Sequence, residues 1–232
     1  MNTRLLLLFF IAAIVGLSAC KKNNDTPTVT STAFLNIVNA STDTVNFYLN
    51  GTRLNNNSNL YPAGSSGYFS VTDGQQNYQV KKLFNPVTNT VQTLFSIPLK
   101  LDSAGDYSLF ITDGTLVNSF STKDVLLAVP DTLATTNCYV RFVNASPGTT
   151  NFDLAVGDTV KFTNVPFKSV SGFQLVGVSG LKPISIYQTG SATPIISGHI
   201  ALTPGYSYTF YSYGKLNGTG NSALGIGFNV YN

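Results

Sequence analysis

Residues 34–41 read FLNIVNAS, and residues 139–146, at an offset of 105, read YVRFVNAS. In both segments apolar residues recur at every second position, which is typical of a strand with one buried face. Asn36 and Arg141 stand between apolar neighbours at equivalent positions, so we expect both side chains to face water. Asn-Ala-Ser closes each segment, and the Asn and Ser side chains can accept backbone N–H bonds and hold a turn. The two segments predict the same strand followed by the same turn in two parts of the chain.

The similarity continues along the chain. The same offset of 105 pairs residues 45–49 with 150–154 and residues 66–69 with 171–174. Further on the offset falls to 101, which pairs Leu101 with Leu202 and Tyr107 with Tyr208, as a loop deletion in the second copy would require. The chain therefore contains an internal duplication.

Each copy has about 95 residues, enough for one sandwich-sized hydrophobic core. We predict a first domain over residues 33–130, a linker over 131–137 and a second domain over 138–232.

The composition favours strands over helices. The ten acidic residues are all Asp, and the only Met is the initiator, so two helix-favouring residues are missing from the body of the chain. Val, Ile, Thr, Phe and Tyr stand in short runs between Gly, Asn, Asp, Ser and Pro, the composition of strands and turns. We predict an all-β protein made of two tandem immunoglobulin-like antiparallel β-sandwiches, with about seven strands in each. The expected strands are 34–39, 45–50, 66–71, 77–84, 91–101, 106–112 and 125–129, then 139–144, 151–156, 170–176, 182–188, 194–202, 206–213 and 223–231.

The N-terminus has the pattern of a bacterial lipoprotein signal. A short basic start and an apolar run over residues 5–15 are followed by LSAC at 17–20, which resembles a lipobox. This pattern predicts that residues 1–19 are a signal peptide and that Cys20 carries a diacylglycerol anchor. Residues 20–32 then form a polar, flexible tether.

Lipidation of Cys20 also predicts where the chain resides. Because Lys21 and not Asp follows Cys20, we expect an outer-membrane location, with the periplasmic and surface-facing leaflets both open. No later apolar stretch approaches the length of a spanning helix.

Charge and cysteine content exclude several classes of protein. Loss of Arg4 with the signal leaves 12 basic side chains against 10 acidic ones, so no basic stripe for nucleic acid is expected. Acylation of Cys20 leaves Cys138 without a disulfide partner. We interpret Cys138 as a small buried strand residue.

Candidate catalytic groups are few. His199 is the only histidine, and its apolar neighbours predict that it faces solvent. No G-x-S-x-G segment is present. The closest carboxylate pairs are Asp102 with Asp106 and Asp153 with Asp158, and both have the sequence context of turns. We therefore expect no catalytic residue, no metal site, no cofactor and no enzyme activity, with a hydrolase as an alternative.

Tyrosines at regular spacing mark a candidate contact face. Tyr206, Tyr208 and Phe210 share one face of a predicted strand, and Tyr211 and Tyr213 share the other. Since one face must lie outside the core, Tyr211 and Tyr213 are candidates for contact with a protein or glycan partner. The alternative is that this face packs against the neighbouring domain.

One short pattern, Asp followed by Ser or Thr and then a small or aliphatic residue, recurs along the chain. It resembles the O-glycosylation acceptor of exported proteins in one large Gram-negative group. The candidate acceptor hydroxyl groups are those of Thr44, Ser103, Thr132 and Thr159.

The second copy resembles the domain-of-unknown-function family 4397. Its segments YVRFVNASP at 139–147, NFDL at 151–154, NVPF at 164–167 and SG at 171–172 follow that family's order of motifs. The first copy departs from the pattern, with Asn36 in place of the arginine, Thr42 in place of Pro147, and LYPA at 60–63 in place of VPFK at 165–168. The resemblance implies a fold and an envelope location and no activity.

The sequence as a whole predicts a non-catalytic, membrane-anchored envelope lipoprotein that serves adhesion, assembly or ligand binding. The alternative from another class is a glycan-binding accessory lipoprotein of a transport or degradation system. The identity of the protein or glycan partner stays open.

Overall fold

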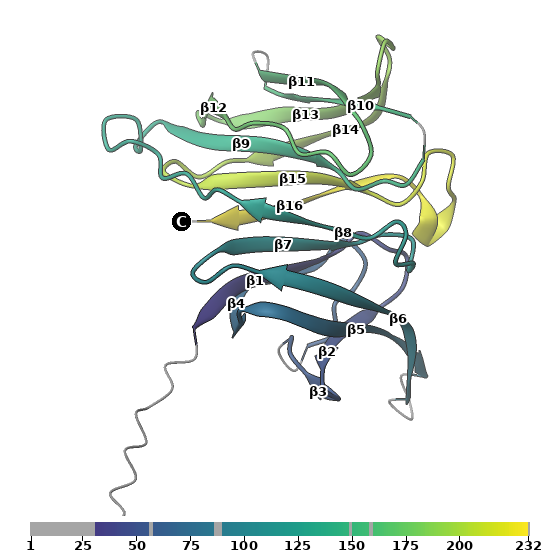
Figure 1. The fold of residues 1–232 in the computed structure, drawn as a ribbon. Coiled ribbons are helices and arrows are strands. Elements are labelled where there is room, and N and C mark those ends of the chain that lie inside the picture. Colours follow the sequence, from purple (N-terminus) through teal and green to yellow (C-terminus); the bar gives the residue numbers. More distant parts are fainter. Residues whose placement is uncertain (1–30, 56–57, 86–89, 149, 158–159, 232) are drawn as a thin grey trace, which may run out of the picture. The chain divides into compact units, whose positions relative to one another are not determined.

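The computed structural model describes residues 31–55, 58–85, 90–148, 150–157 and 160–231 (Figure 1). Residues 31–232 form one compact unit. The predicted signal peptide, Cys20 and the tether up to residue 30 lie outside the described residues. Strands make up nearly all the regular structure in the described part, and one short 3-10 turn, η1 (Gly220–Ser222), is the exception.

The first half is a sandwich of two four-stranded sheets. One sheet has the order β4-β1-β7-β8 and the other the order β3-β2-β5-β6. The strand bounds are β1 Thr32–Asn39, β2 Val45–Leu49, β3 Thr52–Arg53, β4 Ser65–Thr72, β5 Gly74–Asn85, β6 Thr90–Leu101, β7 Asp106–Ile111 and β8 Phe120–Asp124.

The second half repeats this topology. Its sheets have the orders β12-β9-β15-β16 and β11-β10-β13-β14, which are the first orders with eight added to each number. The strand bounds are β9 Asn137–Asn144, β10 Phe152–Val156, β11 Val160–Val165, β12 Gln174–Gly177, β13 Leu181–Gln188, β14 Pro194–Ala201, β15 Ser207–Tyr213 and β16 Gly225–Tyr231. The prediction of an all-β protein built from sandwiches is confirmed.

Three details of the predicted strands were wrong. Each half has eight strands, because β3 and β11 were missed. The last strand of the first half is β8, Phe120–Asp124, and the apolar residues 125–127 that follow it are exposed. Each half also contains one parallel pair, β1 with β7 and β9 with β15, among otherwise antiparallel neighbours.

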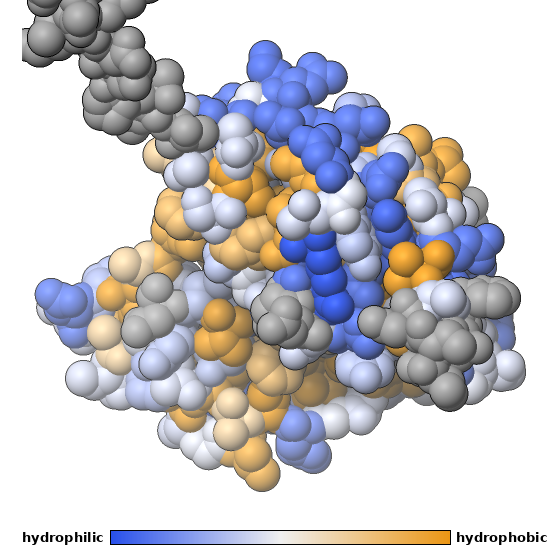
Figure 2. All heavy atoms as spheres, turned by 90° about the horizontal axis from the view of Figure 1, so that it is seen from below, coloured by the Kyte–Doolittle hydropathy of each residue, from blue (hydrophilic) through white to orange (hydrophobic). Residues whose placement is uncertain are grey.

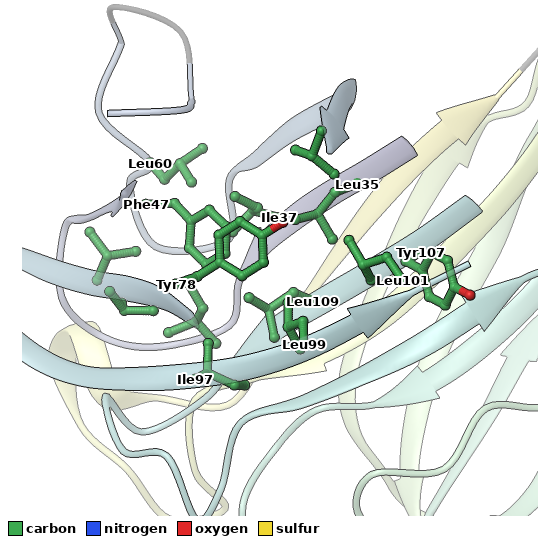
Figure 3. Close-up of a cluster of buried hydrophobic side chains, with 14 of the residues drawn as sticks. Leu35, Ile37, Phe47, Leu60, Tyr78, Ile97, Leu99, Leu101, Tyr107 and Leu109 are labelled. Atoms are coloured by element: carbon green, nitrogen blue, oxygen red, sulfur yellow. The ribbon is translucent and has the colours of Figure 1, made fainter. Parts of the chain in front are cut away.

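Each sandwich has its own hydrophobic core. In the first, the ring of Phe47 stacks on that of Tyr78 at 4.9 Å between centroids, with Leu35 and Leu109 nearby (Figure 3). In the second, Phe152 is buried among residues of both sheets. Phe47 and Phe152 therefore fill equivalent core positions, as the 105-residue offset predicts.

The Asn-Ala-Ser turns have the predicted role. The amide oxygens of Asn39 and Asn144 accept the backbone N–H bonds of Ser41 (3.0 Å) and Ser146 (3.2 Å). Each Asn amide nitrogen also donates to a carbonyl across the fold, that of Leu60 in one half and of Val165 in the other. Both turns are thus fixed by buried Asn side chains.

A repeated Ser side chain accepts a strand N–H bond in each half. The pairing of β1 with β4 shifts register between Asn36 and Val38, and the N–H of Ile37 has no partner residue in β4. The hydroxyl of Ser66 accepts that N–H bond at 2.9 Å. Ser171 does the same for Phe142 at 2.8 Å in the second half. This shared contact explains why Ser recurs at the 105-residue offset.

The sheets β4-β1-β7-β8 and β12-β9-β15-β16 meet through a third cluster of buried residues, which we call the seam (Figure 1). Its fully buried members come from equivalent positions in the two halves: Val38 with Val143, Ala40 with Ala145, and Phe110 with Tyr211. The two halves therefore contact each other through the same face, as the partners in a twofold dimer do.

The expectation that Asn36 and Arg141 face water was wrong. Their exposed fractions are 1% and 4%. The strand alternation points both side chains away from their own sandwich cores, and the facing sheet of the other half covers them at the seam.

Candidate binding sites

A mostly apolar hollow lies at one edge of the second sandwich, and we call it the lateral groove. It has a volume of about 200 Å³ and opens between the edge strands β14 and β16. Its apolar lining consists of Ile184, Ile196, Ile200, Phe210, Ile226 and Phe228. Hydrophobic residues also reach the surface in several separate places on the face that Figure 2 shows.

Two features make the lateral groove accessible. Phe228 is 50% exposed although its ring contacts that of Phe210 at 6.0 Å. In their sheets β14 pairs only with β13, and β16 only with β15, among the strands described. The outer backbone groups of both edge strands therefore lack a strand partner, which is the condition for adding another strand.

The same edge of the first sandwich is built differently. Tyr107 of the first sandwich is equivalent to Tyr208 of the second. The register places Lys123 of β8 opposite Tyr107, and Val230 of β16 opposite Tyr208. The equivalent residue pairs on the two edge strands are Ser121 with Phe228 and Lys123 with Val230. Polar residues on the first sandwich thus correspond to apolar residues on the second.

Lys123 forms an ion pair at this edge of the first sandwich, beside the ring of Tyr107. Its ammonium lies 2.8 Å from a carboxylate oxygen of Asp102 and 5.8 Å from the ring centroid of Tyr107. The Tyr107 hydroxyl donates to the same carboxylate at 2.9 Å. The hydrogen bond from Lys123, followed in size by the one from Tyr107, lowers the pKa of Asp102. The Asp102 carboxylate therefore stays charged.

A buried ion pair crosses the seam on one side. A guanidinium nitrogen of Arg141 lies 2.7 Å from a carboxylate oxygen of Asp124, and these side chains are 5% and 0% exposed. Arg141 Nε also donates to Thr209 at 2.8 Å, and the guanidinium lies 4.8 Å from the ring centroid of Phe173. This pair fixes the two halves against each other, since a buried charge must keep its partner.

Tyr68 adds a third member to this network. Its hydroxyl donates to Asp124 at 2.7 Å. Burial, followed by the nearby Tyr231 and Asp124, raises the pKa of Tyr68 well above its usual range. Tyr68 therefore stays protonated and donates at any physiological pH.

A polar hollow of about 170 Å³ lies on the other side of the seam, and we call it the seam cavity. Its wall includes Asn36, Tyr68, Asn229 and Tyr231. The rings of Tyr68 and Tyr231 lie 5.3 Å apart. Buried polar atoms without a hydrogen-bond partner are concentrated here: Asn36 Oδ1, both amide atoms of Asn229, and the hydroxyl of Tyr231.

The described candidates for chemistry lie in separate parts of the fold. His199 is exposed at the rim of the lateral groove. Asp102 is paired with Lys123, and Asp153 is buried and accepts the hydroxyl of Thr189 at 2.6 Å. Asp158 lies outside the described residues. Within the described ranges, no group of three or more His, Cys, Asp or Glu side chains could hold a metal ion.

Cys138 is buried in the second core, as predicted. Burial raises the pKa of its thiol to about 11. The thiolate, which is the reactive form, is therefore scarce at neutral pH.

The tyrosine face is covered by the first sandwich. Tyr211 is fully buried at the seam, and its hydroxyl donates to the carbonyl of Ala63 at 2.7 Å. Tyr213 is half-buried beside the same cluster. Tyr211 therefore does not face an outside partner, and the alternative of packing against the neighbouring half describes the structure.

The candidate acceptor hydroxyls differ in exposure. Ser103 and Thr132 are exposed, and Thr44 is half-buried. Thr159 lies outside the described residues. Glycosylation at these positions stays a prediction.

Sequence reasoning missed the lateral groove and the seam cavity. A signal for the groove does exist, because the last strands of the two copies, FSTKD at 120–124 and GIGFNVY at 225–231, no longer resemble each other.

In the part of the chain that is described, no helix has the length and apolar character needed to cross a membrane.

Comparison with known proteins gives one family match. Residues 138–225 match the family described as domain of unknown function, DUF4397. No curated protein matches the chain.

Three solved structures are among those that match the chain at low similarity. The TIE protein of Bacillus anthracis is 10% identical with a TM-score of 0.24, and the match covers 78% of this chain and 33% of that one. The carbohydrate-binding module CBMbc (family CBM26) of Eubacterium rectale Amy13K, solved with maltoheptaose, is 12% identical with a TM-score of 0.24, covering 83% of this chain and 95% of that one. A candidate cell adhesion protein of Bacteroides eggerthii is 9% identical with a TM-score of 0.25, covering 87% and 95%. The chain spans only a third of the TIE protein, and similarity at this level carries no argument about function.

Proposed function

We propose that this chain is a non-catalytic envelope lipoprotein that binds an extended segment of a partner protein in the lateral groove, in a role of adhesion or assembly. The observation that carries this proposal is the contrast between equivalent edges. The first sandwich has Ser121 and Lys123 where the second has Phe228 and Val230. The shared fold therefore does not require apolar residues at these two positions of the second sandwich.

An extended peptide is the occupant that fits the lateral groove. Both bordering strands have outer backbone groups that an added strand can pair with. Alternate side chains of that strand point to one side, so its apolar side chains can enter between Ile196, Ile200 and Ile226. Backbone pairing would supply affinity, and the apolar positions would supply specificity.

The anchoring part of the proposal rests on residues 1–20. A diacylglycerol on Cys20 would hold the chain to the outer membrane, with residues 21–31 as the tether to the first sandwich. We further propose that the first half is a diverged copy of the family domain matched by the second half. The identical strand orders support this relationship.

Selection from a random-peptide phage library on the full-length chain tests this function. We expect enrichment of peptides with apolar residues at alternate positions. Binding should be lost when the first sandwich's edge residues are placed on the second, in the double variant Phe228→Ser with Val230→Lys. These side chains are 50% and 43% exposed, so the change should leave the fold intact.

The matched control replaces exposed apolar residues elsewhere. Leu116→Ser with Val117→Lys changes side chains that are 45% and 75% exposed in the β7–β8 loop. This control should bind the selected peptides like the unaltered chain. No enrichment, or equal binding by the groove double variant, would refute the proposal.

A further inference from the structure

The seam cavity occupies the position that corresponds to the buried ion pair. Asn36 is equivalent to Arg141 at the 105-residue offset. The register places Asp124 opposite Asp106 in β7, and Tyr231 opposite Ser207 in β15, so Tyr231 is equivalent to Asp124. Where one side of the seam has an arginine and a carboxylate in contact, the other has the shorter Asn36 and the uncharged Tyr231.

The surroundings of the two positions correspond as well. Arg141 donates to Thr209, and Asn36 makes a longer contact of 3.4 Å to Ser108 at the equivalent place. The remaining equivalent pairs are Thr209 with Ser108 and Phe173 with Tyr68. The seam cavity therefore lies where the other side has the arginine side chain. The amide oxygen of Asn36, the amide of Asn229 and the hydroxyl of Tyr231 lack a hydrogen-bond partner there.

The buried polar atoms at the wall call for a specific kind of occupant. The lining contains no charged residue. Asn229 carries both a donor and an acceptor, Asn36 carries an acceptor, and the Tyr231 hydroxyl is both. These atoms are closed to solvent in the structure, so their side chains must turn toward the hollow to reach an occupant. Hydroxyl groups, which donate and accept, complement such a mixture, whereas an unpaired ion would be buried without a counter-charge.

We propose that the seam cavity binds one neutral sugar unit or a polyol of similar size, which hydrogen-bonds to Asn36, Asn229 and Tyr231 and lies against the tyrosine rings. A hollow of about 170 Å³ holds several water molecules, which is room for a single ring. The aromatic pair Tyr68 and Tyr231 offers apolar surface to the C–H groups of such a ring. This site shares Phe228 with the lateral groove, and Val230 lines it as well, so the two sites are told apart by residues that line only one of them.

Saturation-transfer NMR and calorimetric titration of the full-length chain test the proposal. The ligands are D-glucose, D-galactose, D-mannose, L-fucose and N-acetyl-D-glucosamine, each at millimolar concentration. At least one should bind. The double variant Asn36→Arg with Tyr231→Asp rebuilds the ion pair of the other side, fills the cavity and should weaken binding about tenfold or more.

Two further variants keep the test decisive. Asn229→Ala on the edge strand β16 removes only unpartnered atoms, so it should fold and also weaken sugar binding. Asn77→Arg adds the same charge at an exposed position of β5 and should bind sugar normally. Absence of binding by the unaltered chain, or retention of binding in both cavity variants, would overturn the proposal, as would a crystal structure soaked with these sugars that shows only water in the cavity.

The groove and cavity proposals fail independently. Ile196→Ser alters the lateral groove at a residue that does not line the seam cavity. This variant should lose peptide binding and keep sugar binding, and Asn229→Ala should do the reverse.

Discussion

The two sandwiches share one strand order but use equivalent positions differently. At the edge, Lys123 of the first sandwich is paired with Asp102, whereas Val230 of the second is exposed beside the lateral groove. At the seam, Arg141 of the second has a charged partner, whereas Asn36 of the first lies beside a cavity. The turns and the Ser contacts that hold the fold are the same in both. The differences therefore mark positions that the shared fold leaves free to vary.

Substitutions in the two hydrophobic cores test whether the cores are independent, and they should have the largest effect on stability. Phe47→Ala should cost about 3–5 kcal/mol in the first sandwich, and Phe152→Ala the same in the second, because each empties a fully packed position. Urea unfolding with thiol labelling measures this, since Cys138 is buried in the second core. Phe152→Ala should bring labelling to lower urea, and Phe47→Ala should not. Equal shifts in both variants would show that the halves unfold together through the seam.

The second effect compares the two sides of the seam. Arg141→Ala should destabilise the chain by about 3–5 kcal/mol, because it leaves the buried carboxylate of Asp124 without its partner. Asn36→Ala should cost about 1 kcal/mol or less, since its amide makes one long bond and its oxygen none. Chemical denaturation of both variants measures the difference. Equal costs would refute the asymmetry of the seam.

A smaller effect should be equal in the two halves. Ser66→Ala and Ser171→Ala each remove the acceptor of a strand N–H bond and should each cost about 1 kcal/mol. Loss of protection of the amides of Ile37 and Phe142 in hydrogen exchange locates the effect. A cost confined to one half would show that the Ser contact matters in only one copy.

The smallest effect concerns the exposed ion pair of the first edge. Because the pKa of Asp102 is lowered in the folded chain, its contribution to stability is present above the unfolded pKa and is lost as pH falls through the folded one. Lys123→Val, which introduces the apolar character of the second edge, should raise the Asp102 pKa toward its ordinary value. NMR titration of the carboxyl carbon measures it. An unchanged pKa in the variant would contradict the role given to Lys123.

The sequence predicted what repeats and missed what depends on contacts between the halves. A period of two and the 105-residue offset were enough for the all-β fold, the turns and the buried Cys138. The two-residue strand β3 and the polar strand β8 have too little apolar pattern to be recognised. Asn36 and Arg141 alternate with core residues, and no local pattern states that a second sheet covers the opposite face. The lateral groove depends on β14 and β16 being edge strands, which is a property of topology.

The most direct test of the central claim maps a selected peptide onto the isotope-labelled full-length chain by NMR. We expect shift changes and intermolecular contacts at Ile196, Ile226 and Phe228, with new backbone protection along β14 or β16. The corresponding residues Ser121 and Lys123 of the first sandwich should not respond. Contacts at the first edge, or equal responses at both, would contradict the claim that the second sandwich alone carries the binding site.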